Sequence, residues 1–375
     1  MDNTLFNFLV EQFGIDRNAM PEPLGEGHIN QTWLAYNANG PLVLQKLNTE
    51  VFPSSEMLIN NFSRVATHLL NKQSQGSYPF SVLKLLKNRH GEELTIDPQW
   101  GAWRALSFIE DTVTLQTVNS ESQAYQVAYS FGAFGRALMD LDARDLGEVL
   151  TDFHHLPARL SQLDQAISYA QMHPSTVDGI SRFEMAREAL AFVQSQSGIV
   201  EEIADLQSRG LPLRVTHNDT KVNNVLLKRS DYSASCVIDL DTVMPGYLMY
   251  DFGDMVRTVT SPEREDTKDT DAIVLRPGMF AALVDGYLDS MKGELTELEM
   301  DSLLPGAKLL IFIIGVRFLT DFLNGDSYFG ADFETHNLLR ANNQFALLKS
   351  LLTQEPKLQQ IVADARERIA NNPLS

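Results

Sequence analysis

The spacing of apolar residues changes along this chain. In the N-terminal part apolar and polar positions mostly alternate, as expected for strands that bury one face, whereas from Ser120 onward apolar residues recur every three or four positions, as on amphipathic helices. This change predicts a β-rich region followed by a mainly helical one. We expect N-terminal strands at 41–47, 80–86, 93–96 and 100–110, with helices at 5–13 and 54–70, and later helices at 124–141, 181–195, 199–208, 279–292, 297–304, 308–323 and 343–353.

One polar segment interrupts the helical half. Residues 213–227 have two apolar arms, expected to be strands, around a centre that contains His217, Asp219 and Asn224. This is the spacing of the H-x-D-x-x-x-x-N catalytic loop of protein kinases, in which the Asp takes the proton of the acceptor hydroxyl and the Asn holds Mg²⁺. An apolar strand follows and ends at Asp239, where a carboxylate would be held rigidly enough to bind a metal.

Two upstream features support a kinase-like interpretation. Gly25 and Gly27 precede a predicted hairpin whose second strand ends in Gln45 and Lys46, and in kinase-like folds such a hairpin covers the ATP phosphates while a strand lysine reaches them. We assign that role to Lys46, although a shift of one residue in the strand would give it to Gln45. Phe108, Ile109 and Glu110 would form a hinge whose backbone groups hydrogen-bond with the edge of the adenine base.

These features together predict an α+β, bilobal, protein-kinase-like fold. Residues 1–108 would form a small β-rich lobe that covers the nucleotide, and residues 109–375 a large, mainly helical lobe with the catalytic and acceptor sites. The literal D-F-G triplet at Asp251 follows a loop rather than an apolar strand, so we interpret Asp251 as a helix cap or an anchor for the catalytic loop. His217 is interpreted as a buttress of that loop.

Composition narrows the choice of partners. Thirty Lys and Arg against 49 Asp and Glu give a formal charge of −19, which disfavours nucleic acid and anionic lipid as partners. Cys236 is the single cysteine, so no intrachain disulfide can form, as is typical of cytoplasmic proteins. The apolar run 309–314 is flanked by Lys308 and Arg317 and is shorter than the ~20 residues of a membrane span, so a packed helix is expected.

The motifs around Asp219 and Asp239 resemble those of the aminoglycoside phosphotransferase and choline kinase superfamily. The chain is similar over nearly its whole length to bacterial N-acetylhexosamine 1-kinases, including the segments 25–30, 44–48 and 251–254. This resemblance implies transfer of phosphate from ATP to the anomeric hydroxyl of GlcNAc or GalNAc. It further implies the following roles: Asp219 as base, Asn224 and Asp239 as Mg²⁺ ligands, and His28, Arg317, Tyr328 and Asp219 at the sugar.

Several alternatives stay open at this stage. Arg317 lies in a strongly apolar helix, where an ion pair with Asp321 is an alternative to sugar binding, and Tyr328 can equally be a packing residue. The enzyme can be a sibling kinase for another sugar, choline, homoserine or an aminoglycoside, with Asp241 contributing to an acidic pocket. A kinase-like protein without activity is a third possibility, and a monomer or weak dimer is expected.

Overall fold

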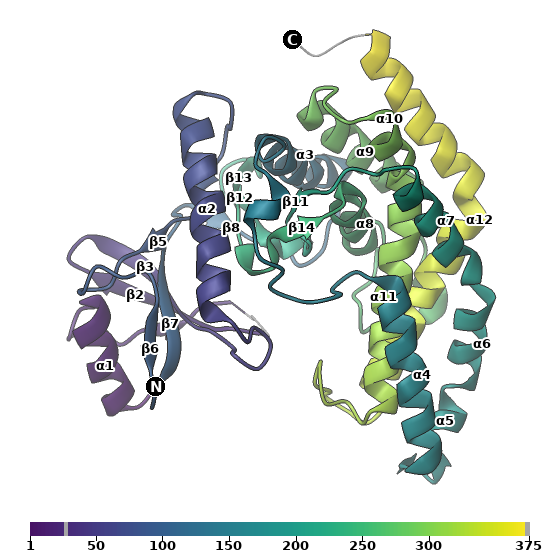
Figure 1. The fold of residues 1–375 in the computed structure, drawn as a ribbon, viewed down its shortest axis with the longest axis horizontal. Helices are drawn as coiled ribbons and strands as arrows, with labels where there is room; N and C mark the ends of the chain where they lie inside the picture. Colours follow the sequence, from purple (N-terminus) through teal and green to yellow (C-terminus); the bar gives the residue numbers. More distant parts are fainter. Residues whose placement is uncertain (26–28, 372–375) are drawn as a thin grey trace.

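A computed structural model describes residues 1–25 and 29–371 of the chain. The N-terminal lobe is built on one antiparallel sheet, in which strands β1, β2, β3, β7 and β5 follow in this order and β6 also pairs with β7 (Figure 1). Helix α1 (Asn3–Phe13) lies on one side of this sheet and α2 (Ser55–Ser74) on the other. The strands are β1 (Glu22–Pro23), β2 (Gln31–Asn37), β3 (Gly40–Lys46), β5 (Leu85–Leu86), β6 (Thr95–Asp97) and β7 (Gly101–Ser107).

Strand alternation gives this sheet two different faces. Leu42 and Leu44 of β3 join Trp103 of β7 and Leu9 of α1 in a separate small core on the outer face. Val43, one position along β3, packs instead against the main core of the protein. Residues of β3 and β7 with the parity of Val43 therefore point towards the second lobe.

The C-terminal lobe is mainly helical, as predicted, and carries three small sheets. Strand β4 pairs in parallel with β13, so residues 80–86 do not form the single strand expected but two short strands in different sheets. The strands are β4 (Ser81–Val82), β8 (Thr112–Val113), β9 (Thr176–Val177), β10 (Ile180–Ser181), β11 (Arg214–Thr216), β12 (Val225–Lys228), β13 (Ala234–Val237) and β14 (Met244–Gly246).

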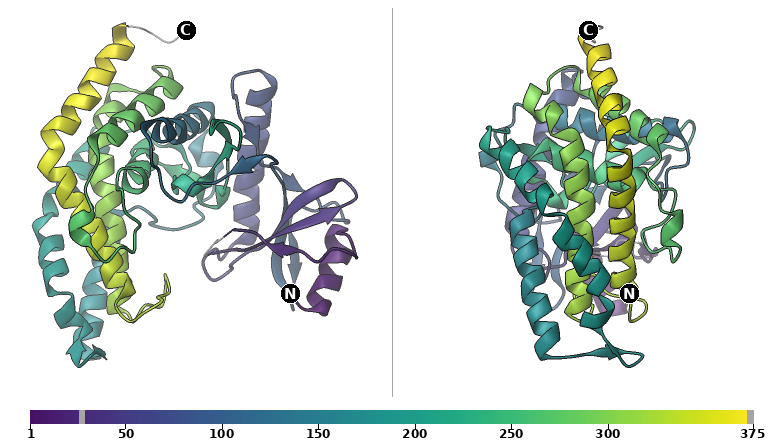
Figure 2. Two further views of the ribbon diagram at one scale, coloured as in Figure 1. Left: turned by 180° about the vertical axis from the view of Figure 1, so that it is seen from behind. Right: turned by 90° about the vertical axis from the view of Figure 1, so that its right-hand side faces the viewer.

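The helices of this lobe differ from the expected set in several places; for example, the expected helix 181–195 is divided into α5 and α6. Residues 156–172, which we had not predicted as helical, form α4, with Pro157 in its first turn. The C-terminal segment is one long helix that runs through Pro356 and along the edge of the molecule (Figure 2). The helices are α3 (Glu121–Ala137), α4 (Leu156–Met172), α5 (Arg182–Met185), α6 (Arg187–Ser195), α7 (Ser197–Ser208), α8 (Leu248–Val259), α9 (Pro277–Met291), α10 (Glu297–Asp301), α11 (Leu303–Leu323) and α12 (His336–Asn371).

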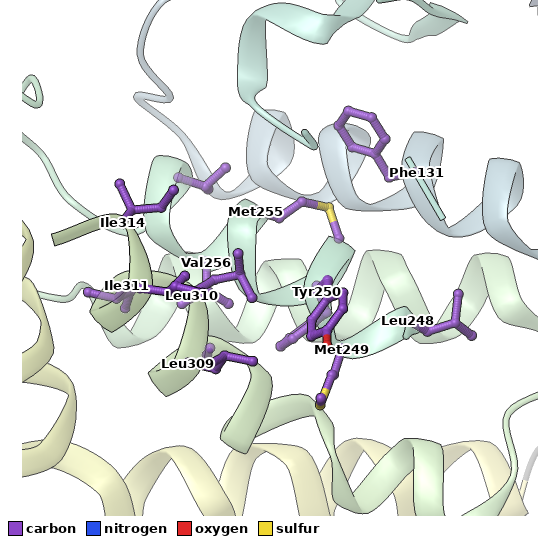
Figure 3. Packing of buried hydrophobic residues seen from close by; sticks show 14 of the residues in the cluster. Phe131, Leu248, Met249, Tyr250, Met255, Val256, Leu309, Leu310, Ile311 and Ile314 are labelled. Atoms are coloured by element: carbon purple, nitrogen blue, oxygen red, sulfur yellow. The ribbon is translucent and has the colours of Figure 1, made fainter. Parts of the chain in front are cut away.

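Helices α8 and α11 meet at the centre of this lobe (Figure 3). Their backbones touch, because a Cβ atom added to Gly253 would lie 2.2 Å from the carbonyl oxygen of Gly306, far inside van der Waals contact. Helix α11 is long and apolar enough to cross a membrane by length and composition, but 83% of its apolar window is buried within the fold. The prediction that this run is a packed helix is confirmed.

Candidate active site

The catalytic loop between β11 and β12 is anchored by Asp251 at the start of α8. The Asp251 carboxylate accepts hydrogen bonds from the amides of His217 (2.9 Å) and Asn218 (2.7 Å), and its own carbonyl accepts one from Thr220 Oγ1 (2.6 Å). Burial raises the pKa of Asp251 to about 6, against the hydrogen bonds from the two amides, which favour the carboxylate. The D-F-G triplet thus serves as a loop anchor, as we inferred.

His217 supports the loop from beneath. Its ring is fully buried between Phe131 and Phe134, and its Nε2 donates to the carbonyl of Ile238 (2.9 Å). Its Nδ1 accepts the amide of Asp219 (3.3 Å), so both ring nitrogens are used in holding backbone. The interpretation of His217 as a buttress is confirmed.

Asp219 projects from this scaffold with its carboxylate held by two neighbours. Lys221 Nζ lies 2.9 Å from Oδ1, and Asn224 Nδ2 donates to Oδ2 (3.1 Å) and to the Asp219 carbonyl (2.8 Å). Burial works to raise the pKa of Asp219, but the Lys221 ammonium outweighs it and the net shift is downward. Asp219 is therefore ionised at neutral pH, as an acceptor of a hydroxyl proton must be.

Asp239 lies where β13 gives way to a 3₁₀ turn, at Leu240–Thr242. Its backbone is left-handed, with φ of 61°, which turns the chain away from the strand direction. Desolvation by neighbouring residues and repulsion from the Asp241 and Asp219 carboxylates raise the pKa of Asp239 to about 7. Its side chain still contacts solvent, so a cation can reach it and relieve this repulsion.

The residues predicted as Mg²⁺ ligands fit a divalent cation. Asn224 uses its Nδ2 towards Asp219, which leaves its Oδ1 without a hydrogen-bond donor among the described residues. Asn224 Oδ1 and the Asp239 carboxylate are therefore two candidate hard oxygen ligands. The described part of the chain contains no group of three His, Cys, Asp or Glu suited to a metal.

Asp241 does not join this site. The sequence left open that Asp241 contributes to an acidic pocket, but the 3₁₀ turn directs its side chain towards the N-terminal lobe. There Arg104 Nη2 lies 2.6 Å from its Oδ1, and Asn30 Nδ2 donates to its Oδ2 (2.6 Å). Asp241 is thus neutralised by an ion pair and does not make an acidic acceptor pocket.

The structure describes some of the residues predicted to contact the nucleotide but not others. Gly25 adopts φ of 75° at the start of the glycine segment, whereas Gly27 and His28 lie outside the described residues. Residues 108–110 form the connection between β7 and β8, where the Ile109 carbonyl accepts Thr112 Oγ1 (2.8 Å) and Glu110 is exposed.

Lys46 is not brought to the site. It shares the outer face of β3 with Leu42 and Leu44, and its Cε lies beside Gly101, which also faces outward. Gln45 has the parity that points towards the second lobe, and it hydrogen-bonds with Arg104. The register therefore favours the alternative that we noted, with Gln45 on the nucleotide side.

Arg317 and Tyr328, which the resemblance places at the sugar, lie together in the structure. The Arg317 guanidinium lies over the rings of Phe153 (5.0 Å), Tyr328 (5.8 Å) and Phe329 (5.2 Å). The ion pair with Asp321 does not form, because that carboxylate accepts the amides of Tyr328 (2.8 Å) and Phe329 (2.9 Å). Among the described residues no carboxylate lies within 4.0 Å of Arg317. The Tyr328 side chain is 56% exposed, so it is not a packing residue of the core.

Arg317 is electrostatically coupled to the catalytic loop. Burial lowers the pKa of its guanidinium, while the hydroxyl of Tyr328 and the carboxylate of Asp219 favour the charged form. A second arginine, Arg159, lies close enough for the two charges to repel, and burial with this repulsion lowers the pKa of Arg159 to about 10. The acceptor side of Asp219 is therefore cationic rather than acidic.

A buried ion-pair network beneath the loop was not foreseen from the sequence. Arg257 of α8 contacts Asp254 (2.8 Å) and Glu265 (2.8 Å), and Glu265 also contacts Arg340 of α12 (2.8 Å). The i,i+3 spacing of Asp254 and Arg257 was the one available signal. Lys221, two residues after Asp219, was visible within the motif but had received no role.

The sequence and the fold were both compared with known proteins. The sequence model of the phosphotransferase enzyme family matches residues 21–293. A microcompartment-associated aminopropanol kinase has a similar structure, with a TM-score of 0.65 at 15% identity, over 94% of this chain and 98% of that one. Amicoumacin kinase gives a TM-score of 0.59 at 13% identity over 92% and 93% of the two chains. A choline/ethanolamine kinase family protein from Mesorhizobium loti gives 0.55 at 16% identity over 93% of each chain.

Proposed function

Because the chain belongs to the phosphotransferase enzyme family, we propose that it transfers the γ-phosphoryl group of ATP to the anomeric hydroxyl of GlcNAc or GalNAc. The observation that carries this proposal is the Asp219 carboxylate, held ionised beside Lys221 at the tip of a buried loop. From this position Asp219 accepts the proton of the sugar hydroxyl as the hydroxyl oxygen attacks the γ-phosphorus; the bond from the γ-phosphorus to the β,γ-bridging oxygen breaks, and ADP leaves.

Two residues would hold Mg²⁺ in this enzyme, namely Asn224 and Asp239. When bound, the ion neutralises charge on the nucleotide phosphates during transfer. Lys221 adds a fixed positive charge next to the base, and Asp251 keeps the loop backbone in place through its two amide contacts. Catalysis would therefore depend mainly on positioning and electrostatics, as phosphoryl transfer requires.

The charge around Asp219 supports a neutral sugar as acceptor. Arg317 lacks a carboxylate partner among the described residues, so it would repel an ammonium group and donate hydrogen bonds to hydroxyl or acetamido oxygens. Aromatic rings such as Tyr328 and Phe329, which surround it, are surfaces on which a sugar ring packs well. His28, whose role rests on the resemblance, would complete this site.

A coupled assay of ADP release with Mg-ATP and a panel of acceptors tests the proposal. The panel contains GlcNAc, GalNAc, glucose, glucosamine, choline, aminopropanol and an aminoglycoside. We expect GlcNAc or GalNAc to give the highest kcat/KM and phosphorus NMR to locate the phosphate on C1.

A preference for choline, aminopropanol or the aminoglycoside would contradict the acceptor class. These cationic acceptors merit inclusion because similar structures include an aminopropanol kinase and a choline/ethanolamine kinase family protein. If no acceptor raised ADP release above the rate in water, a kinase-like binding protein without this activity would be the better explanation.

A further inference from the structure

The inward face of strand β3 carries no cation. In kinase-like folds a lysine on this strand reaches the nucleotide phosphates and pairs with a carboxylate. Here the residue that points towards the second lobe is the neutral Gln45, and the cation next to it, Lys46, faces outward. If this chain binds ATP as proposed, a positive charge has to come from another element.

Arg104 occupies the matching place on the neighbouring strand. It is the cross-strand partner of Gln45, and its side chain is only 1% exposed. Its Nε (2.9 Å) and Nη2 (2.7 Å) both donate to Gln45 Oε1, while Gln45 Nε2 donates to Thr32 Oγ1 (3.1 Å). Gln45 therefore orients the guanidinium rather than replacing the missing charge.

The guanidinium also reaches the other lobe. Its Nη2 lies 2.6 Å from Asp241, which is 3% exposed, and Asn30 holds the second oxygen of that carboxylate. Asn30 Oδ1 in turn accepts the amide of Asn48 (2.9 Å). Asp241 follows the candidate metal ligand Asp239 by two residues in the same 3₁₀ turn, so its pair with Arg104 places the guanidinium next to the expected Mg²⁺ and phosphate position.

One donor group of this arginine remains unused. Arg104 Nη1 is buried and has no hydrogen-bond partner among the described residues, whereas Nε and Nη2 both donate to Gln45 Oε1. A buried, unpaired guanidinium nitrogen costs free energy unless a ligand pairs with it. The planar guanidinium can bind Gln45 and Asp241 on one side and a phosphate oxygen on the other, which an ammonium group does less well.

We propose that Arg104 performs in this chain the task of the strand lysine of other kinase-like folds. Its Nη1 binds a phosphate oxygen of the nucleotide once neighbouring side chains turn aside, and Asp241 is its charge partner. The inference rests on the proposed function only in that the chain binds ATP. The competing explanation is that Arg104 merely neutralises Asp241 and ties the two lobes together.

A double substitution separates these explanations without leaving a buried charge alone. Removing one partner of a buried ion pair is strongly destabilising, so Arg104→Gln is combined with Asp241→Asn, and the unmodified protein is the control. Calorimetric titrations with Mg-ATP, ADP and adenosine are compared for the double variant and the control. We expect Kd for ATP and ADP to be about 10- to 100-fold higher in the double variant than in the control, with Kd for adenosine unchanged in both.

Each other outcome has a defined meaning. Equal ATP affinity in the double variant and the control would overturn the role of Arg104, as would a parallel loss of ATP and adenosine binding. If the double variant does not fold, Arg104→Met combined with Asp241→Leu decides, because apolar side chains of similar volume often replace a buried ion pair without loss of stability. A selective loss of ATP and ADP affinity in this second variant supports the inference, and unchanged affinity overturns it. Absence of ATP binding by the unmodified protein would instead contradict the proposed function itself.

Discussion

The catalytic loop and the acceptor side of this protein are stabilised in different ways. Around Asp219 the loop is fixed by specific hydrogen bonds, above all those of Asp251 and His217 to backbone. On the acceptor side Arg317 rests on aromatic rings, and among the described residues it has no carboxylate partner. The first arrangement fixes the Asp219 carboxylate, whereas the second leaves the guanidinium donors of Arg317 available for a ligand.

Asp219→Ala gives the strongest test of the catalytic side of this contrast. We expect kcat to fall by about 10²- to 10⁴-fold, because no other carboxylate of the loop can accept the hydroxyl proton, while Kd for ATP changes little. Steady-state kinetics and nucleotide titration measure the two effects. Asp231→Ala, at an exposed turn, is the control, and turnover near that of the unmodified protein would remove Asp219 from the role of base.

Arg317→Ala tests the acceptor side with a smaller expected effect. The loss of the unpaired donor should raise KM for the sugar by about 10- to 100-fold and leave KM for ATP within about twofold. Arg187→Ala, which removes an exposed arginine paired with Glu184, controls for a general change of charge. Unfolding of the Arg317 variant in a thermal melt, rather than a selective change in KM, would show that the aromatic contacts matter for stability and not for acceptor binding.

Mg²⁺ binding should depend on pH, because the Asp239 carboxylate is repelled by those of Asp241 and Asp219. Because the pKa of Asp239 is raised to about 7, a proton competes with the cation below that pH, and affinity is lost as pH falls. In the presence of ATP we expect the apparent Kd for Mg²⁺ to rise about tenfold per pH unit below 7 and to level off above it. Asp239→Asn should bind Mg²⁺ weakly at every pH, and a dependence that survives this change would assign it to another group.

Lys46→Ala should produce the smallest effect. Since Lys46 lies on the outer face of β3, KM for ATP is expected to stay within about twofold of the unmodified value. Gln45→Ala is the matched comparison, because loss of its contact with Arg104 should raise KM for ATP more clearly. A large increase in Lys46→Ala and none in Gln45→Ala would restore our original assignment of Lys46.

The sequence predicted those parts of the site that depend on local spacing. His217, Asp219 and Asn224 lie within eight consecutive residues, so their grouping survives any error in the larger fold. The fold class and most helices were also predictable, because long amphipathic patterns are distinctive. The start of α2 is an example, because a helix was expected from residue 54 and Ser54 caps the helix that begins at Ser55.

What the sequence could not predict depended on pairing between distant segments. Arg104 and Asp241 are 137 positions apart, and nothing near either residue indicates that they form an ion pair. The side on which Lys46 lies was decided by the pairing of β3 with β7. Likewise, Asp321 lies four residues after Arg317 on α11, a spacing that allows an ion pair. The loop after α11 instead brings two backbone amides, those of Tyr328 and Phe329, which donate hydrogen bonds to the Asp321 carboxylate.

The backbone contact between α8 and α11 limits how acceptor preference can evolve in this molecule. Helix α8 carries the loop anchor Asp251 and α11 carries Arg317, and Gly253 and Gly306 bring the two helices together without any intervening side chain. Such a junction acts as a fixed spacer, because neither helix can slide or rotate without a collision of main-chain atoms. Under the proposed function, a different acceptor would therefore be accommodated by substitution of side chains such as Arg317 and Tyr328. The distance between the helix that anchors the Asp219 loop and the helix that carries Arg317 would stay the same.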